Sequence, residues 1–179
     1  MQSEIPTPAD AGWTVERVVA LVLLFLLCAV LVWKAYNPED IYLSDLKYEV
    51  LASPEGYEPG KDQNFQKETL RIKDTFYPKG FCVKPDGVIS CRFIPNGYDF
   101  FVAEVGVDAM AGENASVVFQ VIADGTVLYE SPVMRRDMPP RLVRVPIRGR
   151  NELLLHVFDG GDGNAEDVGN WALSRFEYR

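Results

Sequence analysis

Two cysteines and one acidic loop are the parts of this sequence whose residue types and spacing could do chemistry. Cys82 and Cys91 stand at equal distances from Asp86 and Gly87 in the stretch GFCVKPDGVISCRF, residues 80–93. Asp-Gly is a strong signal for a two-residue hairpin turn. In a hairpin closed at this turn, the two cysteines form a non-hydrogen-bonded pair with Cα atoms about 4.5 Å apart, which a disulfide can bridge.

We therefore predict a Cys82–Cys91 disulfide, with two buried free thiols as the alternative. A zinc site is disfavoured because the chain has one histidine and no second cysteine pair. Disulfides persist in oxidising compartments. The prediction therefore places the domain outside the cytoplasm, in the periplasm if the chain comes from a Gram-negative bacterium.

The acidic loop DGGDGNAED, residues 159–167, contains Asp159, Asp162 and Asp167. Carboxylates on adjacent turns can coordinate Ca²⁺ through oxygen, so these residues are candidate calcium ligands. The loop does not follow the EF-hand pattern, because the sixth position from Asp162 is an aspartate and the twelfth is Leu173. The alternative is an ion-free turn in which Asp167 accepts hydrogen bonds from loop amides.

Other chemistry is not indicated. His156 lies in the apolar run LLLHVF, with no serine or cysteine partner implied, and no nucleophile–base pair or phosphate-binding loop emerges. We therefore predict that the chain is not an enzyme and that it has no cofactor other than a possible Ca²⁺. The formal net charge is -8, which argues against nucleic acid as a partner, because phosphate binding needs basic patches.

The elements that must position these residues are short strands. Apolar runs alternate with polar residues and are separated by turn signals, and no stretch of the soluble part has a helical period. Such a pattern predicts an all-β fold of two packed antiparallel sheets, a sandwich or jelly roll. The candidate strands are 46–52, 69–72, 80–84, 88–93, 98–108, 115–124, 126–131, 142–147, 152–159 and 171–178.

Ahead of these strands, residues 18–33 read VVALVLLFLLCAVLVW, without a charge. With Trp13 and Tyr36 at the interfaces, residues 14–36 predict a transmembrane helix, leaving a cytoplasmic tail over 1–13, a juxtamembrane linker over 37–45 and a domain over 46–179. A cleaved signal peptide is disfavoured because no small-x-small site follows the run. A lipoprotein signal is disfavoured because Leu27 precedes Cys28, and Cys28 is read as inert packing in lipid.

The order of the remaining segments resembles the NPCBM family, carbohydrate-binding modules with a galactose-binding-like jelly roll. The segments are TLRI (69–72), FYPKGF (76–81), NGYDFFVAEVGVD (96–108), SVVFQVIADGTVLYES (116–131), PRLVRVPIRGRNELLLHVFDGGDG (140–163) and EDVGNWALSRF (166–176). The resemblance implies the jelly-roll fold and glycan binding. Where the family commonly has a glycine-x-histidine segment, this chain has Cys82, Val83 and Lys84.

Four side chains are candidate contacts for a partner or glycan. They are Lys84 in the altered tract, Arg135 and Arg136 in a loop whose flexible methionines and arginines favour protein interfaces, and Trp171. Trp171 is either a platform on which a sugar stacks or, as is commoner for tryptophan at the entry to a strand, a core residue.

We expect a single-pass, membrane-anchored accessory subunit that docks on the extracytoplasmic face of a larger integral-membrane complex, for example an energy-transducing assembly. The alternative is a membrane-anchored carbohydrate-binding module that recognises surface or envelope glycans. A diverged appendage of a hydrolase is less favoured, because no catalytic domain accompanies the sandwich.

Overall fold

The computed structural model of the chain describes residues 14–36, 39–92, 94–163 and 166–178. The chain divides into two compact units, residues 1–38 and residues 39–179. The predicted cytoplasmic tail, 1–13, lies outside the described residues.

Helix α1, Val15–Tyr36, is the structured part of the first unit. At about 1.5 Å per residue its 22 residues span roughly 33 Å, and the segment Val15–Lys34 is long and apolar enough to cross a membrane. Thr14 Oγ1 accepts a hydrogen bond from the Arg17 amide at 3.4 Å, as an N-cap residue does. All side chains from Val15 to Lys34 are exposed.

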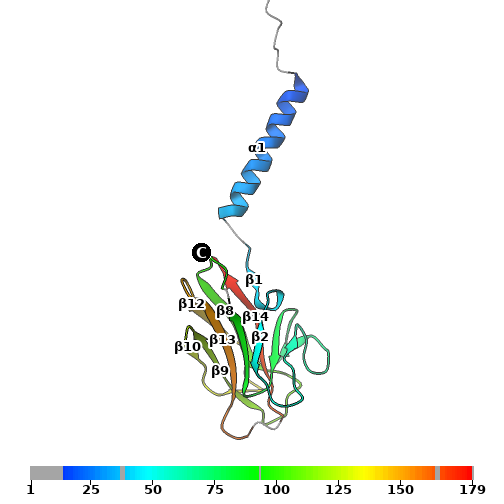
Figure 1. Cartoon of the computed structure of the whole chain (residues 1–179). Helices are drawn as coiled ribbons and strands as arrows, with labels where there is room; N and C mark the ends of the chain where they lie inside the picture. Colours follow the sequence, from blue (N-terminus) through cyan, green and yellow to red (C-terminus); the bar gives the residue numbers. More distant parts are fainter. Residues whose placement is uncertain (1–13, 37–38, 93, 164–165, 179) are drawn as a thin grey trace, which may run out of the picture. The chain divides into compact units, whose positions relative to one another are not determined.

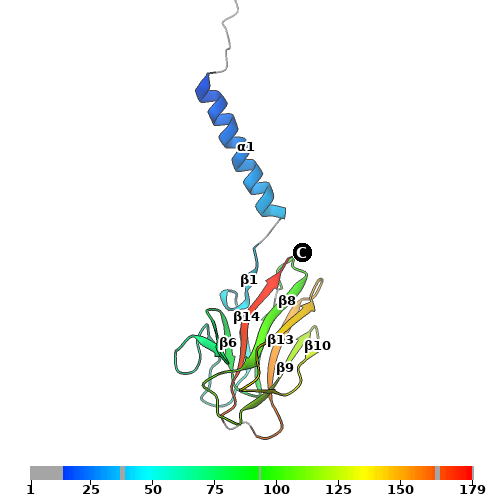
Figure 2. The same cartoon turned by 180° about the vertical axis from the view of Figure 1, so that it is seen from behind.

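The second unit is the predicted sandwich of two antiparallel sheets, visible as two layers in Figures 1 and 2. The first sheet has the order β12 (Arg141–Pro146), β8 (Phe100–Val107), β14 (Gly169–Glu177), β6 (Gly80–Val83), β3 (Gly60–Lys61), with β1 (Ile41–Tyr42) paired to β14. The second sheet has the order β10 (Thr126–Glu130), β9 (Ser116–Ala123), β13 (Glu152–Asp159), β7 (Gly87–Arg92), β2 (Glu49–Ala52), with β11 (Met134–Arg135) paired to β9. Strands β4 (Leu70–Ile72) and β5 (Thr75–Tyr77) form a separate hairpin.

The main core fills the space between the sheets and is rich in aromatic side chains. Its largest fully buried members include Trp171, Phe81, Phe101, Phe119 and Phe176. A second, smaller cluster contains Leu70, Ile72, Tyr77, Cys82 and Ala172, so the β4–β5 hairpin covers an outer part of the first sheet. Aromatic side chains bury large apolar areas, which lets the short strands hold together.

The domain begins earlier than the sequence suggested. Residues 37–45 were predicted to be a linker, but Ile41 and Tyr42 pair with Phe176 and Arg175 of β14. They are followed by a 3₁₀ turn, Leu43–Asp45, whose Leu43 side chain is buried in the main core. The boundary therefore lies at Glu39, because two residues of strand pairing and one buried leucine are too short a pattern to be seen in sequence.

The predicted Cys82–Cys91 disulfide is wrong in this structure. Cys82 lies on β6 in the first sheet and Cys91 lies on β7 in the second, and both are free and buried. The turn between the strands is closed by a 3.0 Å hydrogen bond from the Gly87 amide to the Lys84 carbonyl, with Asp86 at φ 66°. Pro85 therefore occupies the first central position of a type II turn, and the chain crosses between sheets instead of forming a hairpin.

Burial raises the pKa of both thiols, that of Cys91 to about 11 and that of Cys82 well above its ordinary value. Both cysteines are therefore neutral, unreactive core residues. Without the disulfide, the cysteines give no information on which side of a membrane the domain lies.

Candidate functional site

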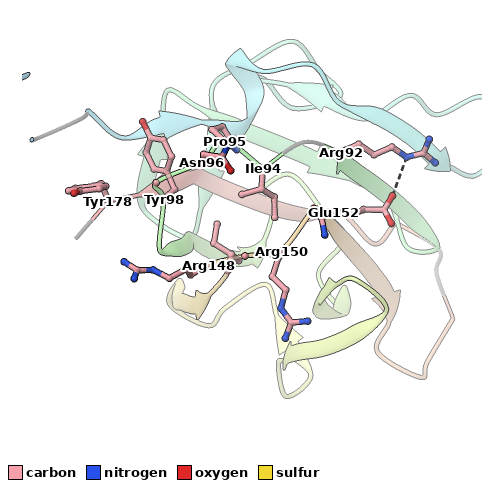
Figure 3. Close-up of a pocket in the computed structure, with 13 residues that line it drawn as sticks. Arg92, Ile94, Pro95, Asn96, Tyr98, Arg148, Arg150, Glu152 and Tyr178 are labelled. Atoms are coloured by element: carbon pink, nitrogen blue, oxygen red, sulfur yellow. Dashed lines mark hydrogen bonds and ion pairs between the residues drawn. The ribbon is translucent and has the colours of Figure 1, made fainter. Parts of the chain in front are cut away.

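A cavity of about 1040 Å³ lies at the end of the sandwich where β7, β12 and β14 finish and β8 and β13 begin (Figure 3). Its walls are the loop 94–98, the turn 147–151 and the C-terminal end of the described chain. Polar and aromatic residues dominate the lining: Arg92, Asn96, Tyr98, Arg148, Arg150, Asn151, Glu152 and Tyr178.

Backbone hydrogen bonds hold the walls of this pocket in place. The Ile147 amide donates to the Asp99 carbonyl at 2.8 Å, and the Ile94 amide donates to the Asn151 carbonyl at 3.5 Å. The Arg150 amide closes the turn onto the Ile147 carbonyl at 2.9 Å. Gly149, at φ 76°, occupies the position of this turn that needs a left-handed backbone. The two loops are therefore fixed to each other before any ligand arrives.

Two arginines of the pocket are already paired. The highly exposed Arg148 side chain donates from Nε to the carboxylate of Asp99, whose side chain is 7% exposed. This hydrogen bond raises the pKa of Arg148. On the opposite side Arg92 Nε donates to Glu152 Oε1 at 3.2 Å, the contact drawn as a dashed line in Figure 3. The guanidinium groups are therefore oriented at two separate places around the pocket.

Two tyrosines lie together on one side of the pocket in Figure 3. Tyr98 is nearly buried, and its hydroxyl donates to the Glu39 carbonyl at 2.8 Å. Burial and the nearby carboxylates of Asp40 and Glu39 raise the pKa of Tyr98. Tyr178 is 40% exposed, so its ring is the part of this wall that a ligand can cover.

Taken together, the lining suits a polar ligand that carries ring faces and several hydroxyl groups. Aromatic rings cover apolar faces, while amide, carboxylate and guanidinium groups donate and accept hydrogen bonds. The described lining residues include no serine, threonine, cysteine or histidine, so this part of the chain offers no nucleophile paired with a base. The pocket is suited to binding.

Sequence reasoning did not find this pocket. The segments Pro95-Asn96-Gly97 and Arg148-Gly149 were visible only as turn signals. About fifty residues separate them along the chain, and it is the pairing of β8 with β12 that brings their ends together. The usable signal was that each turn carries amide, aromatic or arginine side chains beside its glycine.

The three aspartates predicted as calcium ligands do come together. One carboxylate oxygen from each of Asp159, Asp162 and Asp167 lies within 4.8 Å of the others. Asp167 is 1% exposed, and its Oδ2 is buried with no hydrogen-bond partner among the described residues. Burial, and next the charges of Asp162 and Asp159, raise the pKa of Asp167. A buried acceptor without a donor is costly, and a divalent cation would satisfy it, so the residues fit Ca²⁺.

The other four predicted contact residues are dispersed. Lys84 Nζ lies 4.0 Å from the centre of the Tyr57 ring, and Arg135 Nη1 lies 3.5 Å from Asp162 Oδ2. Arg136 lines a smaller groove of about 410 Å³ together with Arg71 and Lys73. None of these side chains lines the pocket of Figure 3.

Trp171 is a core residue and not a sugar platform in this structure. Its side chain is 0% exposed and packs edge-on against Phe119, with ring centres 5.1 Å apart, and against Phe101 at 6.2 Å. Position 171 lies in the central strand β14 with its side chain between the sheets, which leaves no ring face for a ligand.

Comparison with known proteins agrees with this fold. The model of the NPCBM/NEW2 domain family matches residues 39–177. A CBM51 module from Clostridium perfringens GH95, solved in complex with methyl-galactose, superposes with a TM-score of 0.71 at 33% identity, over 77% of this chain and 99% of that module. The structure of CBM51-2 in complex with GlcNAc, together with the INT domains, from Clostridium perfringens ZmpB matches with a TM-score of 0.72 at 28% identity, over 79% of this chain and 32% of that one.

A curated relative is a Renibacterium salmoninarum protein named "Putative endo-alpha-N-acetylgalactosaminidase", 28% identical over 146 residues and 77% of this chain. The chain spans 10% of that relative's length. The solved structures that resemble this domain contain carbohydrate-binding modules, which bind sugars and are non-catalytic.

Proposed function

The chain belongs to the NPCBM/NEW2 domain family over residues 39–177, and we propose that it is a membrane-anchored carbohydrate-recognition protein without catalytic activity. The helix α1 serves as the anchor and the sandwich binds the glycan. The observation that carries the proposal is the match, at 33% identity and over 99% of its length, to a CBM51 module solved with methyl-galactose.

This proposal replaces the accessory subunit of an integral-membrane complex as the preferred function. The family match and the solved modules support glycan recognition, which was the alternative. None of these similarities concerns a subunit of a membrane complex. The polar pocket also favours glycan recognition, because a subunit that only docks on another protein needs no such pocket.

We assign the glycan to the pocket of Figure 3. The exposed ring of Tyr178 offers a face for a sugar ring. Asn96 and Asn151 on the facing loops offer amides that both donate and accept hydrogen bonds. The loops are held by backbone hydrogen bonds, so little conformational entropy is lost on binding. A neutral pyranose such as a galactoside is the first ligand to test.

The orientation follows from the ligand and not from the cysteines. Surface and envelope glycans lie outside the cytoplasm, so the domain is extracytoplasmic and the N-terminal tail cytoplasmic. Protease added to intact cells should degrade the domain and leave a tail epitope protected. Degradation of the tail epitope in place of the domain would reverse the orientation.

A calcium ion supports the sandwich away from the glycan pocket. Asp159, Asp162 and Asp167 would hold it, since carboxylate oxygens are the ligands that Ca²⁺ prefers. The ion would supply the charge that the buried oxygen of Asp167 lacks. CaCl₂ should raise the melting temperature of the full chain and EGTA should reverse the rise, without a direct effect on sugar contacts.

Binding of methyl-galactoside and GlcNAc to the full chain in detergent micelles tests the main proposal. We expect measurable binding by calorimetry, and a roughly fivefold loss of affinity in Tyr178→Ala, because one aromatic contact contributes about 1 kcal/mol. Tyr178→Phe should keep most of the affinity. The matched control is Phe76→Ala, since Phe76 is an exposed aromatic on β5 that does not line the pocket.

Two results would contradict the proposal at different levels. Binding that survives Tyr178→Ala and is lost in Arg136→Ala would move the glycan to the groove of Arg71, Lys73 and Arg136. Failure of the full chain to bind any member of a broad glycan array would remove carbohydrate recognition altogether.

A further inference from the structure

Arg135 is placed beside the acidic loop by its strand. It belongs to β11, and its backbone pairs with Ser116 at the start of β9. Its Nη1 lies 3.5 Å from Asp162 Oδ2, and the other oxygen of that carboxylate accepts a 2.6 Å hydrogen bond from Ser116 Oγ. A guanidinium group therefore stands at one edge of the aspartate trio.

The same loop contains a carboxylate that Arg135 does not reach. Asp167 Oδ1 accepts a 2.9 Å hydrogen bond from the Ser116 amide, while Oδ2 is buried without a partner among the described residues. The Asp159 carboxylate accepts hydrogen bonds within its own turn, from the Gly161 and Gly163 amides at 3.0 and 3.2 Å. Among the described aspartates of the trio, the Arg135 guanidinium pairs with Asp162, so it neutralises only part of their charge.

Arg135 and a bound Ca²⁺ would each neutralise part of the negative charge of the three aspartates. Three ionised aspartates carry -3, and the single positive charge of Arg135 leaves -2, which is the charge that one divalent cation would neutralise. A guanidinium at the edge of the site also repels a divalent cation in the centre, since like charges in a partly exposed site interact through a moderate dielectric. Arg135 therefore has two opposite effects, one on the ion-free loop and one on ion affinity.

We propose that Arg135 is a built-in counter-cation of the acidic loop, which keeps the loop folded when Ca²⁺ is absent and lowers the affinity for Ca²⁺. The inference rests on the calcium site proposed above and is independent of the glycan pocket. The lowered affinity means that a higher Ca²⁺ concentration is needed to fill the site, because the ion-free loop is already partly neutralised.

Calorimetric titration with CaCl₂ tests this on the full chain in detergent, after removal of metal with EGTA and dialysis. Arg135→Gln should bind Ca²⁺ about tenfold more tightly than the unmodified chain at low ionic strength, and the difference should shrink as salt is raised. Its melting temperature in EGTA should be lower than that of the unmodified chain, and the rise on adding CaCl₂ should be larger.

Arg136→Gln is the matched control. It removes the same charge one residue away, from a side chain that lines the separate groove with Arg71 and Lys73, and should leave Ca²⁺ affinity within about twofold. Asp159→Asn, at the half-buried position of the trio, should weaken Ca²⁺ binding in both backgrounds and so locate the ion. Asp167→Asn is the second such variant.

Equal or weaker Ca²⁺ binding by Arg135→Gln overturns the proposal. Absence of binding by both the unmodified chain and Arg135→Gln overturns it together with the calcium site. Binding by Arg135→Gln alone supports it, since the guanidinium then blocks the ion completely. Methyl-galactoside titration of the same samples reports separately on carbohydrate recognition, so the failure of one proposal is distinguishable from that of the other.

Discussion

Cys82 packs beneath the β4–β5 hairpin, whereas Cys91 packs in the core between the two sheets. The two thiols are therefore separated by the first sheet of the sandwich. We expect both to be reduced and shielded in the native protein, because each is buried and its pKa is raised.

Mass spectrometry after alkylation checks this. In a Cys28→Ser variant, iodoacetamide should modify neither remaining cysteine of the native protein and both after denaturation without reductant. A denatured protein that resists alkylation until dithiothreitol is added would indicate a disulfide and would require a different pairing of β6 and β7.

Trp171 should matter for stability and not directly for sugar binding. Trp171→Ala leaves a large cavity between Phe101 and Phe119, and should cost about 3–5 kcal/mol of unfolding free energy. Trp171→Phe should cost less, because it keeps an aromatic ring in the core. Urea unfolding measures both. A Trp171→Ala variant with unchanged stability and abolished galactoside binding would show that the ring is a ligand platform after all.

Gly80, the first residue of β6, occupies a position where only glycine fits. Its φ is 135°, and a Cβ at this position would lie 2.3 Å from the Trp171 carbonyl oxygen. Gly80→Ala should therefore destabilise the domain by about 2–4 kcal/mol through backbone strain and overpacking.

Gly125 provides the matched control for Gly80. It also has a positive φ, 74°, but a Cβ there would meet no atom within 4 Å. Gly125→Ala should cost only about 1–2 kcal/mol, from the left-handed backbone alone. Equal losses in the two variants would mean that the close approach to Trp171 contributes nothing.

The pH dependence of stability should carry the signature of the one histidine in the chain. Burial lowers the pKa of His156 in the folded state, with Asp86 acting in the opposite direction. Below a pH of about 6.5 the unfolded chain therefore binds a proton that the folded chain resists, and the unfolding free energy falls as the pH falls.

Urea unfolding between pH 7.5 and pH 5 measures this decline, and His156→Gln should flatten it, since the carboxylates with lowered pKa values titrate below this range. A decline of equal size in the variant would assign the effect to other groups.

Part of the fold follows from local patterns alone. Alternating apolar residues predict ten of the strands, because a half-buried strand shows its two faces directly in sequence. The uncharged run from Val18 to Trp33 predicts α1, because a continuous apolar run of this length is typical of a membrane-spanning helix. The aspartates of the acidic loop lie within nine residues, so their convergence was also readable. Strands β1, β3 and β11 were missed because two residues carry no period, and β5 was missed although β4, which also has three residues, was predicted within 69–72.

Which sheet each strand joins was decided by tertiary structure. Two Asp-Gly pairs look alike in sequence, yet Asp124 and Gly125 both have positive φ and close a true hairpin between β9 and β10. Asp86 and Gly87 follow Pro85, whose fixed φ selects a type II turn, and the chain passes to the other sheet.

Long-range packing also decides the burial of Trp171 and the formation of the pocket by two loops some fifty residues apart. Local patterns show which residues of a strand share a face, whereas the partner of that face depends on long-range packing.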